Sequence, residues 1–77
     1  MDSDVSVIGR TGVLTVATRG QSGPGEALIG VRGGSETFLA WSDDPLPLGV
    51  TVLVVECRGP RTVGVVAWPD PNDTPFR

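Results

Sequence analysis

Five short runs of β-branched and apolar residues, separated by glycine and proline, constrain the fold of this chain more than any other feature of its sequence. None of the runs shows the 3.6-residue apolar period of an amphipathic helix. Their enrichment in valine, isoleucine and threonine is typical of strands. The sequence therefore predicts an all-β chain, with strands at residues 7–18, 26–32, 36–41, 50–57 and 62–68.

The connections between these runs contain the residues that turns require. Residues 19–25 combine glycine, serine and proline, which predicts a turn or a short loop. Tight hairpin turns are predicted at residues 33–35 (Gly-Gly-Ser) and 58–61 (Arg-Gly-Pro-Arg). The longer stretch at residues 42–49 is expected to cross one end of the sheet.

Five short strands in a small domain suit a closed barrel, because closure removes exposed strand edges. The long link between the third and fourth strands favours a five-stranded, OB-like Greek-key barrel, and an SH3-like small barrel is the alternative. Residues 50–57 are apolar on both faces, so this strand is expected to be covered on both sides. The predicted organisation is a disordered N-terminus (1–6), the barrel (7–69) and an irregular tail (70–77).

The chain has no histidine, lysine or tyrosine, and it has one cysteine, Cys57. Most acid–base, nucleophilic and metal-dependent chemistry uses those side chains. We therefore expect no catalytic residue, no metal, no cofactor and no enzymatic activity. Cys57 lies in an apolar run and is expected to be a buried structural thiol. Asp43 and Asp44 are adjacent in a proline-bounded loop, so both carboxylates are expected to be solvated rather than tuned for catalysis.

The net charge of -3 opposes binding to phosphate, which needs clustered cations. Nucleic acid is nevertheless the alternative partner, since OB-like barrels often bind single strands on the face formed by strands two and three. That region offers Arg32, Phe38 and Trp41. Phe38 and Trp41 have opposite parity, so at most one of them faces outward on a regular strand.

Four segments of the chain together resemble the soluble C-terminal domain of NfeD-like proteins. Residues 8–15 (IGRTGVLT) resemble the opening strand of that family, in which two glycines and a threonine are spaced in this way. Three further segments follow in the order that the family shows. They are the alanine at position 40 followed by residues 45–49 (PLPLG), the strand at residues 52–56 (VLVVE), and residues 63–65 (VGV) after a glycine turn.

The resemblance implies an OB-fold barrel and a membrane-associated setting, with a partner of the SPFH (stomatin/flotillin) class. The longest mostly apolar stretch, residues 46–55, is shorter than the roughly 20 residues that a spanning helix needs. A cytoplasmic domain that reaches the membrane through its partner is therefore expected. Self-association is the other expected interaction.

The expected contact residues are Leu46, Leu48 and Trp68, with Arg58 and Arg61 as a charged rim. Leu46 and Leu48 either plug one end of the barrel or form an apolar contact patch. Trp68 is expected to close a barrel end, and the alternative is an exposed anchor for a partner, since tryptophan is enriched in binding hot spots.

Overall fold

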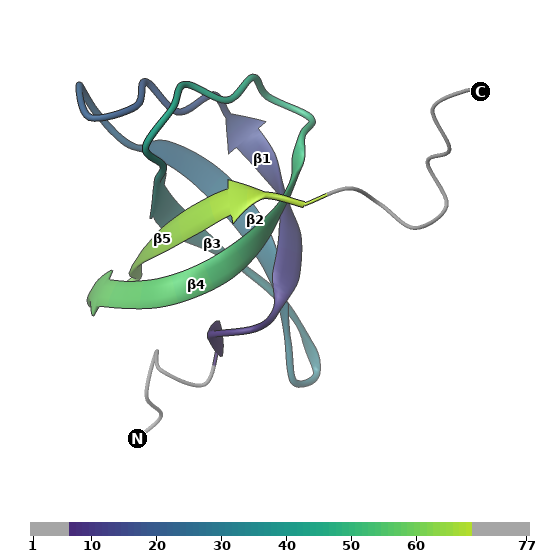
Figure 1. Ribbon diagram of the computed structural model, residues 1–77. Coiled ribbons are helices and arrows are strands. Elements are labelled where there is room, and N and C mark those ends of the chain that lie inside the picture. Colours follow the sequence, from purple (N-terminus) through teal and green to yellow (C-terminus); the bar gives the residue numbers. More distant parts are fainter. Residues whose placement is uncertain (1–6, 69–77) are drawn as a thin grey trace.

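The computed structural model describes residues 7–68, which form a small barrel (Figure 1). The predictions for residues 1–6 and 70–77 lie outside these described residues. Within residues 7–68 the chain forms five strands, namely β1 (Thr11–Val16), β2 (Gly25–Val31), β3 (Gly34–Trp41), β4 (Thr51–Gly59) and β5 (Thr62–Ala67).

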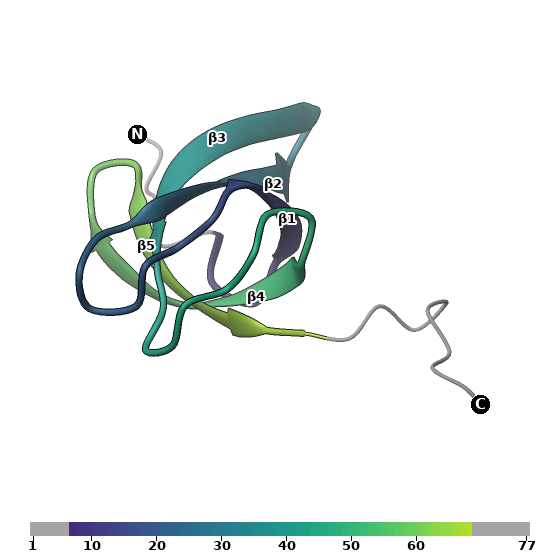
Figure 2. The same ribbon diagram turned by 90° about the horizontal axis from the view of Figure 1, so that it is seen from above.

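The strands close into a barrel in the order β1-β2-β3-β5-β4, and β4 returns to pair with β1. Neighbouring strands are antiparallel except for β3 and β5, which are parallel. This order follows from the 42–50 connection, which carries the chain across one end of the barrel (Figure 2). The predicted five-stranded, OB-like barrel is confirmed, with the crossover after the third strand as expected.

The core is built from alternate residues of every strand. Ala27 and Ile29 are buried on β2, and Phe38 and Ala40 are buried on β3. The buried apolar residues are Val7, Leu14, Ala27, Ile29, Phe38, Ala40, Val52, Val54, Val63 and Val65. Period-two burial on each strand is what a single closed sheet around one core requires.

Gly12 allows β1 and β2 to approach each other over the core. It lies opposite Ile29 in the strand register. A Cβ at this position would lie 2.6 Å from Cδ1 and 3.0 Å from Cα of Ile29, and it would also meet the carbonyl oxygen of Leu28. A side chain at position 12 would therefore displace Ile29 from the core.

The first strand is shorter than predicted, because residues 7–10 form a turn instead. The N–H of Arg10 donates to the carbonyl oxygen of Val7 at 2.9 Å, and the N–H of Gly9 donates to that of Val54 at 2.8 Å. This turn places Val7 in the core. The prediction of a strand over residues 7–18 was therefore wrong at both ends, since β1 spans Thr11–Val16.

The prediction that residues 50–57 are covered on both sides was also wrong. Val52 and Val54 face the core, but Leu53 is half-buried and Val55 is exposed. β4 is flanked by β1 and β5 along its edges, yet a single-layered barrel has no second layer to cover its outer face. Cys57 is likewise half-buried rather than buried, with its Sγ 3.8 Å from the carbonyl oxygen of Gly59.

Candidate interaction surface

The outer side of β2, β1 and β4 carries a row of side chains without charge. Val13 lies directly opposite Leu28 on β2 and opposite Thr51 on β4. Residues directly opposite each other in an antiparallel pair project from the same side of the sheet. Leu28, Val13 and Thr51 therefore form one continuous row across three strands.

A second row continues this surface onto β5. Thr11 lies opposite Leu53, and Leu53 lies opposite Val66. The backbone N–H of Trp68 donates to the carbonyl oxygen of Thr51 at 2.8 Å, and this bond places Trp68 beside the first row. We call the two rows the uncharged face; it consists of Thr11, Val13, Leu28, Thr51, Leu53, Val66 and Trp68.

The apolar side chains of the uncharged face are open to solvent. The exposed fractions are 43% for Val13 and Leu28, 42% for Val66 and 44% for Trp68. This surface was not expected from the sequence, because the second face of strand 50–57 was predicted to be covered. The signal that was present is Leu28, which interrupts the alternation of β2 on its polar face.

The three predicted contact residues, Leu46, Leu48 and Trp68, differ in how far they are exposed. Leu46 is partly buried and packs against the core, so it helps to close the end of the barrel that the 42–50 connection crosses. Leu48 is 68% exposed in the 42–50 connection that leads into β4. Trp68 is 44% exposed at the edge of the uncharged face, and its role as an anchor for a partner stays a prediction.

Arg58 and Arg61 lie far from these residues along the barrel. β4 and β5 are antiparallel, with Thr51 and Trp68 at one end of the pair. Arg58 and Arg61 flank the turn at the other end. They therefore do not form a rim around the uncharged face.

Arg58 is held on the outer surface by two neighbours. Its Nε donates to Oε2 of Glu56 at 2.8 Å, and its guanidinium lies 5.6 Å from the ring centroid of Trp41. The side chain of Glu56 covers Gly64 of β5. This cluster lies on the β4–β5 side of the barrel and leaves Trp41 half-buried.

Arg61 connects the β4–β5 turn to β3. Its Nη1 donates to Oε1 of Glu36 at 2.7 Å, and its guanidinium lies 5.8 Å from the ring centroid of Phe38. Both members of the ion pair are about half exposed to solvent. The contact joins the turn before β5 to β3, next to the parallel pairing of β3 with β5.

The three residues of the nucleic-acid alternative do not form one stacking surface. Phe38 is 2% exposed inside the barrel, which agrees with the prediction that at most one of the two aromatic rings faces outward. Trp41 lies under Arg58 at the end of β3. Arg32 is exposed in the β2–β3 turn, at the opposite end of that hairpin from Trp41.

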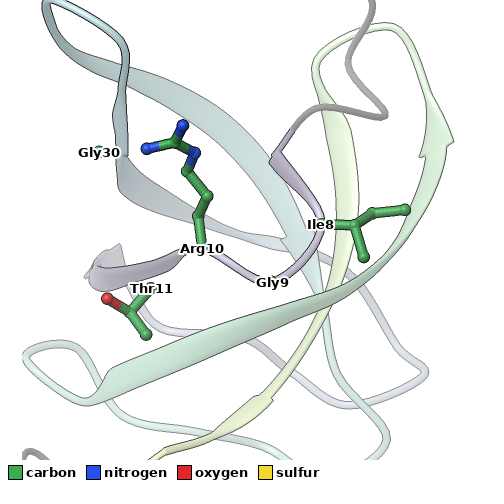
Figure 3. Close-up of a pocket in the computed structure, with 5 residues that line it drawn as sticks. All are labelled: Ile8, Gly9, Arg10, Thr11 and Gly30. Atoms are coloured by element: carbon green, nitrogen blue, oxygen red, sulfur yellow. The ribbon is translucent and has the colours of Figure 1, made fainter.

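An open hollow of about 550 Å³ lies where the chain enters β1 (Figure 3). It is lined by Ile8, Gly9, Arg10, Thr11 and Gly30. The side chains of Arg10 and Ile8 point in different directions from the segment that leads into β1 (Figure 3). Among residues 7–68, Arg10 is the one titratable residue that lines the hollow.

The described residues contain neither a metal cluster nor a spanning helix. No three cysteine, aspartate or glutamate side chains among residues 7–68 come together to hold a metal ion. Asp43 and Asp44 are both exposed in the 42–50 connection. Within the same residues, no helix is long and apolar enough to cross a membrane.

The strand order and the closed core define a small OB-like β-barrel domain. The sequence model of the NfeD C-terminal domain family matches residues 11–66, and the chain belongs to that family. Its structure is similar to the solution structure of the soluble domain of the NfeD protein YuaF from Bacillus subtilis, with a TM-score of 0.70 and 29% sequence identity over 83% of this chain and 76% of that one. A search of curated proteins found no match. The family resemblance drawn from residues 8–65 is thus confirmed.

Proposed function

We propose that this domain is a non-catalytic protein-interaction module whose partner is a membrane-associated scaffold of the SPFH class. The observation that carries the proposal is the uncharged face, on which apolar side chains from β2, β1, β4 and β5 are exposed side by side. Exposed apolar patches on small domains mark interaction sites. The class of the partner is what membership of the NfeD family implies.

Trp68 and Leu48 are the proposed anchors at one edge of this contact. Tryptophan contributes a large apolar area with little conformational freedom to lose, which makes it a frequent hot spot. Leu48 is the most exposed large apolar residue among residues 7–68. We place Leu46 under the contact as a support, and we place Arg58 and Arg61 outside it.

The proposal locates the domain, residues 7–69, in the cytoplasm, where binding to the scaffold brings it to the membrane surface. Association with a second copy through the same face is the competing use of this surface. Sedimentation of the purified domain distinguishes the two, because a self-associating face gives a concentration-dependent mass in the absence of the scaffold.

A matched pair of leucines tests the proposed contact. Leu28 and Leu39 are 43% and 44% exposed on the neighbouring strands β2 and β3, but only Leu28 belongs to the uncharged face. The test is flotation of the domain with vesicles that carry a purified SPFH-class protein from the same cells. Leu28→Ser is expected to weaken binding at least about tenfold, the loss typical of an apolar side chain that becomes buried in an interface.

Leu39→Ser is expected to bind like the unaltered domain within about twofold, because Leu39 lies outside the uncharged face, opposite Glu26. Equal binding by both variants would show that the scaffold uses another surface. Failure of the unaltered domain to float with the vesicles would reject the proposed partner class.

A further inference from the structure

The edge of β5 that faces β3 is left open over its last residues. The parallel pairing of β3 with β5 ends at Trp41 and Gly64, whereas β5 continues to Ala67. Beyond Trp41 the chain turns into the 42–50 connection. β3 therefore does not accompany β5 to its end.

Two hydrogen bonds establish which way the backbone of Ala67 points. The N–H of Trp68 donates to the carbonyl oxygen of Thr51, so even-numbered residues of β5 face β4. The carbonyl oxygen of Arg61 accepts from the N–H of Leu39, so odd-numbered residues face β3. Because backbone polar groups alternate between the two edges of a strand, the N–H and C=O of Ala67 point away from β4.

A hollow of about 180 Å³ lies beside this open edge. It is lined by Ser42, Asp43, Asp44 and Leu46 of the connection, and by residues 65–67 of β5. A dry cavity of about 150 Å³ in another protein holds a benzene-sized group, so the hollow is large enough for one medium apolar side chain. Among residues 7–68, no backbone hydrogen bond joins Ala67 to the 42–50 connection across it.

The charge beside the hollow is negative. Asp43 and Asp44 are exposed, and neither belongs to an ion pair within residues 7–68. The apolar lining comes from Leu46 and residues 65–67. A ligand that matches this surface therefore has an apolar side chain, a positive charge next to it and a free backbone edge.

We propose that this hollow, the β5-edge groove, receives an extended basic peptide segment of a partner protein as an added strand. One residue of the segment pairs with the N–H and C=O of Ala67, the mode of strand addition that open sheet edges support. A neighbouring apolar side chain enters the groove, and a lysine or arginine faces Asp43 and Asp44. A second copy of this chain is disfavoured, because its net charge is also -3.

This inference rests on the proposed function as a protein-binding domain, but it concerns a neighbouring surface, which has Val66 and Leu46 in common with the proposed scaffold contact. The test is a titration of the isotope-labelled chain with an end-blocked peptide Lys-Val-Thr-Val-Arg, followed by amide chemical shifts. Shifts are expected at Ala67, Asp43 and Leu46, with saturation at or below about 1 mM. The matched peptide Glu-Val-Thr-Val-Glu is expected to bind at least about tenfold more weakly, because it faces the two carboxylates with like charges.

Backbone pairing and charge have separate controls. N-methylation of the central residues of the basic peptide removes its donors and is expected to abolish the shift at Ala67. The double change Asp43→Asn and Asp44→Asn is expected to remove most of the preference for the basic peptide. In the free chain, the Ala67 amide is expected to exchange with solvent faster than that of Val66, which faces β4.

Slow exchange of the Ala67 amide in the free chain would contradict the claim that the β5 edge is open at this residue. Absence of shifts at Ala67 with millimolar basic peptide, or equal binding of the acidic and basic peptides, would overturn the proposed ligand. Leu28→Ser is expected to leave peptide binding unchanged. Loss of scaffold binding with intact peptide binding in Leu28→Ser would show that the two contacts are separate. Loss of peptide binding in Leu28→Ser would contradict the proposed position of the peptide.

Discussion

Thr18 Oγ1 and Ser42 Oγ lie 2.6 Å apart, and both residues are buried. The pair joins the 17–24 connection to the 42–50 connection at one end of the barrel (Figure 1). Ser42 Oγ donates to the carbonyl oxygen of Asp44 at 2.7 Å, and Thr18 Oγ1 accepts from the N–H of Leu46 at 2.8 Å. The consistent arrangement is therefore that Thr18 donates its hydroxyl proton to Ser42.

Replacement of the buried Thr18 hydroxyl is expected to destabilise the barrel. Thr18→Val keeps the shape of the side chain but leaves the hydroxyl of Ser42 and the N–H of Leu46 each without one partner. The expected loss in the free energy of unfolding is about 1–3 kcal/mol, the cost of buried polar groups that lose a hydrogen bond. Urea denaturation measures it.

Thr37→Val is the matched control, because Thr37 is exposed on the outer side of β3. This change is expected to alter stability by no more than about 0.5 kcal/mol. If Thr18→Val and Thr37→Val cost the same, the hydroxyl pair does not stabilise this end of the barrel.

A side chain at position 12 is expected to force β1 away from β2. Gly12→Ala places a methyl group against Ile29 and the backbone of Leu28, so overpacking is expected to cost about 1–3 kcal/mol or more. Gly30→Ala is the control, since a Cβ at Gly30 meets nothing within 4 Å. Thermal unfolding of both variants checks the prediction, and an undisturbed Gly12→Ala variant would contradict the close approach.

The ion pair between Glu36 and Arg61 is expected to contribute little to stability. Its side chains are 49% and 60% exposed, and exposed pairs are worth about 0–1 kcal/mol. Glu36→Gln is therefore expected to cost less than about 1 kcal/mol in urea denaturation, and the difference is expected to shrink at about 1 M salt. A larger loss that persists in high salt would mean that this pair holds β3 and β5 together.

The two tryptophans are expected to differ in access to solvent. Trp68 is exposed on the uncharged face, whereas Trp41 is half-buried beneath Arg58. Acrylamide is therefore expected to quench the Trp41→Phe variant, which emits from Trp68, more strongly than the Trp68→Phe variant. The opposite order would contradict the placement of Trp68 at the surface.

Much of the fold follows from local patterns in the sequence. Residues 26–32 alternate in sequence, and the face with Ala27 and Ile29 lies in the core. The opposite parity of Phe38 and Trp41 predicted that at most one ring faces outward, and Phe38 is the buried one. The glycine-rich turn and the long connection predicted the hairpin and the crossover. These features depend on neighbours in sequence, and such neighbours are visible without the structure.

The features that the sequence did not predict depend on distant neighbours. An apolar second face on β4 looks the same in sequence whether another layer covers it or solvent does, so the exposure of Val55 was missed. Thr18 and Ser42 are separated by 24 positions, and only the crossover brings them together. The open edge at Ala67 likewise depends on where β3 ends relative to β5.

The most direct test of the central claim follows Trp68 during binding to the scaffold. The Trp41→Phe variant would be mixed with vesicles that carry the purified SPFH-class protein, and acrylamide quenching would be compared with that of the free variant. The account predicts a blue-shifted emission and reduced quenching in the bound state, because the uncharged face becomes covered. Binding that leaves the emission and quenching of Trp68 unchanged would contradict it.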